Sequence, residues 1–75
     1  EEFCVLLPNT SASGAEVLID QLRHLLRSGA LPARPAFSAG IATWTDGESK
    51  HDLLQRADRA LYAAKAAGKD RSVVA

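Results

Sequence analysis

Two adjacent acids open the chain and could hold a divalent cation. Glu1 and Glu2 come immediately before five apolar residues, 3–7, and Pro8 ends that run. An uninterrupted apolar run is typical of a strand buried on both faces, and a proline cannot extend the hydrogen-bonded ladder. The carboxylates would then lie at the end of a buried strand, where oxygen ligands favour Mg²⁺ or Mn²⁺ over zinc. The alternative is that both are solvated surface acids.

A second charged group lies near the other end of the chain. Lys65 and Lys69 are four residues apart, so a continuous helix would present both on one face. Two ammonium groups so placed could bind phosphate as point charges. The alternative is structural, because cations at a helix C-terminus are favoured by about 0.3–1 kcal/mol each. Carboxylates and lysines together fit phosphoryl transfer, but no other acid in the sequence is a clear third metal ligand.

Composition excludes several classes of protein. The 75 residues carry nine basic and nine acidic side chains, so no net charge directs the chain toward nucleic acid or a membrane surface. No stretch approaches the roughly 20 apolar residues of a membrane span, and no signal peptide is visible. The phosphate-binding patterns GxxxxGK[ST] and GxGxxG are both absent. Cys4 alone excludes an internal disulfide, and its apolar neighbours predict a buried core residue in a cytoplasmic protein. Because the chain contains no methionine, we expect a piece of a longer protein.

A helix is predicted after the first strand. Ser13 and Glu16 form a capping-box pattern at its start, and Gly29 is suited to end it. Charged residues such as Arg23 should lie mostly on the solvent side, and two prolines predict a loop over residues 31–35. The apolar residues at helical spacing, which should pack on a sheet, are Ala15, Leu18, Ile19, Leu22, Leu25 and Leu26.

A strand, a second helix and a short strand are predicted in the second half. Residues 36–45 alternate as a strand does, and Gly40 among them indicates close approach by another backbone, a side chain or a ligand. The alternative for Gly40 is packing of a helix on a face of small residues. Ser49 marks the start of the second helix, Gly68 its end, and residues 71–74 could form a last strand. The order strand–helix–strand–helix–strand predicts an α/β fold, an α+β sandwich with helices on one or both faces.

Three blocks of the sequence resemble one family, and they occur in that family's order. Residues 56–71, RADRALYAAKAAGKDR, are similar to the final helix of GGDEF domains, the catalytic domains of diguanylate cyclases. Residues 38–42, SAGIA, resemble the family's Ser-x-Gly-Ile/Val-Ala strand. Glu1-Glu2-Phe3 resembles the end of the Gly-Gly-Asp/Glu-Glu-Phe signature, which an apolar strand ending in Leu-Pro usually follows. The resemblance covers the whole chain and implies that residues 1–75 are the C-terminal portion of a single, palm-like GGDEF domain.

The resemblance implies a reaction and a set of site residues. In the family, two GTP-loaded domains face each other in a homodimer and form cyclic di-GMP and pyrophosphate. Glu1 matches a metal ligand, for Mg²⁺ or Mn²⁺, that also serves as the base for the attacking 3′-hydroxyl. Glu2 matches a further active-site acid, which we assign to substrate binding. Lys65 matches the lysine that contacts the GTP phosphates, and Lys69 stands where the family often has arginine, so charge is kept without a bidentate grip.

Parts of the family's site are not in these 75 residues. They include the two signature glycines, a metal-binding aspartate and the guanine-reading residues. We therefore expect the fragment alone to be inactive, to expose apolar surface and to self-associate, and we expect a sensory or regulatory domain upstream. Two alternatives remain for the function. One is a degenerate module that binds GTP or cyclic di-GMP as a regulatory input, and the other is a non-catalytic dimerisation domain.

Overall fold

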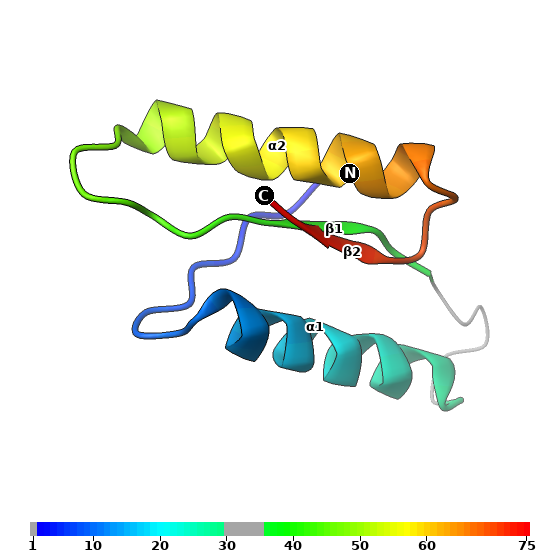
Figure 1. Cartoon of the computed structure of the whole chain (residues 1–75). Coiled ribbons are helices and arrows are strands. Elements are labelled where there is room, and N and C mark those ends of the chain that lie inside the picture. The colour runs from blue at the N-terminus through cyan, green and yellow to red at the C-terminus, as the bar shows by residue number, and fades with distance from the viewer. Residues whose placement is uncertain (1, 30–35) are drawn as a thin grey trace.

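Two helices enclose a pair of short strands in the computed structural model, which describes residues 2–29 and 36–75. In chain order the elements are α1 (Ala12–Arg27), β1 (Ala39–Ile41), α2 (Lys50–Ala66) and β2 (Ser72–Val74). The strand pair lies between the two helices, with α2 on one face and α1 on the other (Figure 1). The α+β fold class is thereby confirmed. Glu1 and the predicted loop over residues 31–35 lie outside the described residues.

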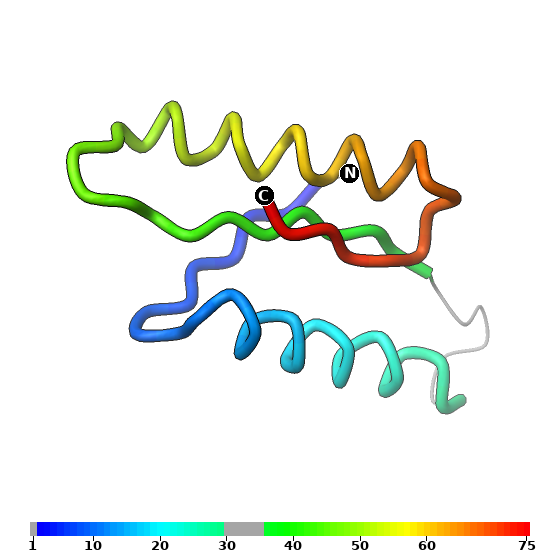
Figure 2. The backbone as a smooth tube through the Cα atoms, viewed as in Figure 1, coloured from blue at the N-terminus to red at the C-terminus, as the bar shows by residue number. Residues whose placement is uncertain are grey.

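The two strands are parallel, and α2 is the crossover that joins them. Gly40 in β1 is opposite Val73 in β2, and Ile41 is opposite Val74. Parallel neighbours need a long connection, which the second helix supplies. Figure 2 shows the chain leaving β1, returning along α2 and entering β2 beside its starting point. β1 has three residues, fewer than the predicted strand over residues 36–45.

Helix α1 begins two residues earlier than the capping pattern predicts. The N-cap is Ser11, whose hydroxyl accepts a hydrogen bond from the Gly14 N–H at 3.1 Å. Ser13 already lies inside the first turn, where its hydroxyl is 3.2 Å from that of Ser11. The other end agrees with the sequence, because Gly29 follows the C-cap with a left-handed φ of 108°.

The face of α1 that packs on the strands is rotated from the predicted one. Ala15 is buried as expected, but Leu18, Leu22 and Leu25 keep 45%, 45% and 65% of their surface exposed. Arg23, predicted on the solvent side, instead turns toward the strands, and its side chain is only 11% exposed. The long aliphatic stem of arginine can cover apolar surface while its charged end finds polar partners, and hydrophobic spacing alone does not reveal this.

Helix α2 packs closely on β1. Ser49 is its N-cap, as predicted, and Gly68 follows its C-terminus with a φ of 125°. Ala60 and Ala64 are buried. A Cβ added to Gly40 would lie 2.2 Å from the Ala57 carbonyl oxygen, so the glycine permits the helix backbone to approach the strand.

The apolar run at the start of the chain is exposed. Residues 2–7 have no regular secondary structure, and Phe3 and Leu6 are 87% and 80% exposed. The predicted buried position of Cys4 is therefore wrong, since its thiol is free and exposed. An apolar run shows a preference for burial, but a strand also needs a neighbouring strand and a covering layer, and the described residues supply neither. Neither helix in the described part of the chain has the length and apolar character needed to cross a membrane.

Candidate functional site

A small hollow at the C-terminal end of α2 brings the two predicted phosphate-binding lysines together. It has a volume of about 340 Å³, and we call it the lysine pocket. One wall comes from the end of α2 and the turn after it, and the other comes from the segment that enters β1. The lining residues are Ala36, Phe37, Ser38, Lys65, Lys69 and Asp70.

The turn after α2 places Lys69 beside the helix end. The Gly68 N–H donates to the Lys65 carbonyl at 3.3 Å, and the Lys69 N–H donates to the Ala64 carbonyl at 3.0 Å. These two bonds form a Schellman motif, which satisfies the last carbonyls of the helix and reverses the chain. The chain therefore folds back, so that a residue beyond the helix and one in its last turn line the same hollow.

The start of the chain reaches the same end of α2. The Lys65 ammonium lies 3.6 Å from a carboxylate oxygen of Glu2, and both side chains are about half exposed or more. An exposed pair of this kind contributes only about 0.2–1 kcal/mol, so its interest is positional. Three of the four predicted site residues, Glu2, Lys65 and Lys69, thus gather around one end of the second helix, while Glu1 lies outside the described residues.

Among the described residues around the lysine pocket, Glu2 is the carboxylate that could contribute to a metal site. The Glu2 carboxylate is a hard oxygen ligand of the kind that Mg²⁺ and Mn²⁺ prefer. Within residues 2–29 and 36–75, however, no three His, Cys, Asp or Glu side chains converge as metal ligands. Any such ion would need further ligands from Glu1, water or the substrate.

A charged network, which the sequence does not predict, lies behind the lysine pocket. Arg23 of α1 contacts Asp70, which lies 47 residues further along the chain and lines the pocket. The spacing places Arg23 next to Ile19 and Leu26 on the helix surface, but it does not indicate whether the arginine faces the strands or the solvent. Nothing in the spacing of a single sequence indicates that Asp70 is the partner.

Another ion pair orders the loop between β1 and α2. The Arg56 guanidinium donates two hydrogen bonds to the Glu48 carboxylate, at 2.6 and 2.8 Å, and another to the Thr43 carbonyl at 2.5 Å. The Arg56 guanidinium is the main reason that the pKa of Glu48 is lowered to about 2, with Thr45 adding hydrogen bonds to the same carboxylate. Arg56 lies nine residues, roughly 13 Å, before Lys65 on α2. The pair therefore stabilises the loop and is not part of the lysine pocket.

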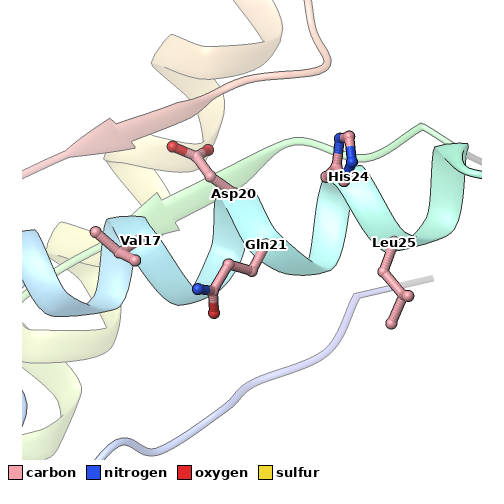
Figure 3. Close-up of a pocket in the computed structure, with 5 residues that line it drawn as sticks. All are labelled: Val17, Asp20, Gln21, His24 and Leu25. Carbon is pink, nitrogen blue, oxygen red and sulfur yellow. The ribbon is translucent and has the colours of Figure 1, made fainter.

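A larger hollow lies on the surface of α1. It measures about 510 Å³ and is lined by Val17, Asp20, Gln21, His24 and Leu25, all from one helix (Figure 3). All five side chains come from one helix, whereas the lining of the lysine pocket combines side chains from two separate segments. His24, among these residues, is exposed.

Known proteins are similar to this chain over most or all of its length. The family model described as "Diguanylate cyclase, GGDEF domain" matches residues 1–71. Diguanylate cyclase DgcP of Pseudomonas aeruginosa is 40% identical over 80 residues, which cover 100% of this chain and 12% of that protein. Diguanylate cyclase DgcM of Escherichia coli is 36% identical over 77 residues, covering 100% of this chain and 19% of its own length.

A spirochaete protein gives a similar result. Diguanylate cyclase A of Treponema denticola is 34% identical over 77 residues, covering 95% of this chain and 21% of that protein. The chain thus spans between 12% and 21% of the length of these relatives. No solved structure is a significant match to the chain.

Proposed function

The chain belongs to the GGDEF domain family of diguanylate cyclases, and from that premise we propose that residues 1–75 are the C-terminal portion of one such domain. The protein that contains it would condense two GTP molecules into cyclic di-GMP and pyrophosphate. The observation that carries this proposal is the lysine pocket, where Lys65 and Lys69 line one hollow and Glu2 lies beside Lys65. This arrangement offers cations for a polyphosphate close to a carboxylate.

Each site residue has a role that its chemistry supports. Lys65 and Lys69 would bind the GTP phosphates through charge, since an ammonium group is a compact point charge with freely rotating donors. Glu2 would help to bind the substrate beside Lys65. Glu1 would accept the proton of the attacking 3′-hydroxyl and would hold Mg²⁺ or Mn²⁺. Such an ion, when bound, neutralises charge that develops on phosphate oxygens.

We extend the proposed function to the whole protein. Two GTP molecules must meet for the reaction, which is why we expect a homodimer with one loaded site on each subunit. The relatives are several times longer than this chain, which leaves room for an upstream sensory or regulatory domain. We propose that the domain lies in the cytoplasm, where GTP is available, and that this segment contacts neither nucleic acid nor membrane. Upstream segments could still anchor the whole protein in a membrane. The isolated fragment should be inactive because Glu1, Glu2 and the lysines form only part of a catalytic site.

Titration of the full-length protein with GTP and Mg²⁺ separates this function from its alternatives. Formation of cyclic di-GMP supports the cyclase. Saturable binding without product would indicate a degenerate regulatory module, and no binding would indicate a dimerisation domain.

The role of Lys65 can be tested by the same titration. Lys65→Ala should weaken GTP binding by about tenfold or more, the loss typical of one charge-assisted contact. Lys50→Ala is the matched control, because Lys50 begins α2 at the end far from the pocket. Equal effects of the two substitutions would contradict the assignment of Lys65.

A further inference from the structure

Arg23 joins three separate segments of the chain. Its side chain is 11% exposed, and its guanidinium lies 4.7 Å from the centre of the Phe37 ring. It donates hydrogen bonds to the Phe37 carbonyl at 3.4 Å and to the Ser72 hydroxyl at 3.3 Å. It also forms ion pairs with Asp20 on its own helix at 2.8 Å and with Asp70 at 3.4 Å. One arginine of α1 therefore holds the entrance to β1 and the segment that enters β2.

Asp70 is held from two sides. Its carboxylate contacts Arg23 and Arg27 of α1, and its N–H donates to the Ser38 hydroxyl at 3.0 Å. The Arg23 Nε and one Asp70 carboxylate oxygen are buried, and neither has a hydrogen-bond partner in the described part of the chain. These two atoms face each other at 3.4 Å, so the charge of each is balanced in part by the other.

The turn formed by Lys69 and Asp70 has an unfavourable backbone conformation. Lys69 and Asp70 both adopt left-handed conformations, with φ of 65° and 51°. Residues with a Cβ are uncommon in that region, and two in succession need support from their surroundings. Aspartate tolerates this conformation better than lysine does. The contacts of Asp70 therefore also fix the direction in which the chain presents Lys69.

We propose that Arg23 is a positioning residue for phosphate binding: through Asp70 it holds the turn that presents Lys69 to the lysine pocket. Arg23 is not among the residues that line the pocket, and it would act only through its neighbours. The inference rests on the proposed function, since it takes Lys69 to bind a phosphate of GTP. It assigns a task to a charged side chain of α1 that is only 11% exposed.

A double-mutant cycle on GTP affinity in the full-length protein tests the inference. Lys69→Ala should weaken binding by about tenfold, and Arg23→Gln should weaken it by a similar factor. If Arg23 acts through Lys69, the double variant should bind within about twofold of Lys69→Ala alone. The inference would be overturned if the two losses of GTP affinity multiply in the double variant. It would also be overturned if Arg23→Gln melts at a lower temperature but binds GTP normally.

Two further variants keep the test independent of folding. Asp70→Asn removes the carboxylate charge but keeps the N–H that bonds Ser38, and asparagine tolerates a left-handed φ. It should reproduce the Arg23→Gln loss and be equally non-additive with Lys69→Ala. Asp20→Asn is the matched control, because Asp20 pairs with Arg23 but is 69% exposed and does not contact the turn. It should bind GTP within about twofold of the unaltered protein.

The outcomes also separate this inference from the function on which it rests. If the unaltered protein binds no GTP, both fail together. If it binds GTP and Lys69→Ala weakens binding, but Asp70→Asn does not, only the positioning role of Arg23 fails. If Lys69→Ala has no effect on a protein that binds GTP, the positioning role fails as well, because there is no phosphate contact for Arg23 to support.

Discussion

Two arginines show how side chains of one type differ with their surroundings. Arg56 is bidentate to Glu48 and closes a loop within one stretch of sequence. Arg23 spans elements that are far apart in the sequence and lies behind the candidate site. The first is a local clamp whose loss should affect stability, while the second links packing to the position of a lysine.

The Glu48–Arg56 pair should make the domain sensitive to acid over a defined range. The folded protein lowers the pKa of Glu48 from 4.5 to about 2, so the unfolded chain takes up a proton first as the pH falls. The stability that the pair contributes is complete above about pH 4.5 and is lost as the pH falls toward 2. Unfolding followed against pH by the fluorescence of Trp44, whose indole N–H donates to the Glu48 carbonyl, should show this loss.

Glu48→Gln provides the comparison for that experiment. It keeps the shape of the side chain and removes the charge, so its stability should vary less between pH 4.5 and 2. Identical profiles for the two proteins would contradict the assigned role of the pair.

At the scale of elements, the ends of the helices were easier to predict than their faces. Ser49, Gly29 and Gly68 were assigned correctly because caps depend on local hydrogen bonds and on backbone conformations that glycine favours. The face of α1 was only partly right, because Leu18 and Leu25 remain exposed. Burial depends on what the rest of the structure offers, which spacing alone does not contain.

The displaced start of α1 gives a test that compares two neighbouring serines. Ser11→Ala should lower the free energy of unfolding by about 1 kcal/mol, because it removes the acceptor for the Gly14 N–H. Ser13→Ala should cost clearly less, since Ser13 lies within the first turn. Chemical denaturation of both variants measures the difference. A larger loss for Ser13→Ala would restore the capping box predicted from the sequence.

The contact between β1 and α2 leaves no room for a side chain at position 40. Gly40→Ala would place a Cβ 2.2 Å from the Ala57 carbonyl oxygen and 2.3 Å from the Leu61 nitrogen, so backbone must move. We expect a loss of about 3 kcal/mol or more, measured by thermal unfolding. Gly14→Ala is the control, because its nearest neighbour is the flexible Thr10 side chain at 3.2 Å. A Gly40→Ala variant as stable as this control would contradict the close packing.

At the scale of the whole molecule, the sequence predicts more regular structure than residues 2–29 and 36–75 adopt. The α+β class followed from local patterns, and the family from three motifs. The first strand did not form among the described residues, since Phe3 and Leu6 have no layer to cover them. Only Ala15, Ala60 and Ala64 are buried apolar residues in the described part of the chain, and so small a core is consistent with the expected self-association. Light scattering on the 75-residue chain measures this self-association.

The candidate site was predicted to a similar extent. Helical spacing and the family resemblance indicate Lys65 and Lys69, and both residues line one hollow. Their supports, Arg23 and Asp70, could not be found in this way because the pair joins residues 47 positions apart. Local spacing can nominate a charged side chain, whereas the partner that holds it is set by the tertiary fold.

Cyclic di-GMP synthesis by the full-length protein, with and without the Glu1→Gln substitution, tests the central claim most directly. The measurement is product formed from GTP and Mg²⁺, alongside a melting curve for each protein. We predict that the unaltered protein forms cyclic di-GMP, whereas Glu1→Gln forms none and melts at the same temperature, because it lacks only the carboxylate that we propose as metal ligand and base. Failure of the unaltered protein to form product, or undiminished synthesis by a folded Glu1→Gln variant, would contradict the account.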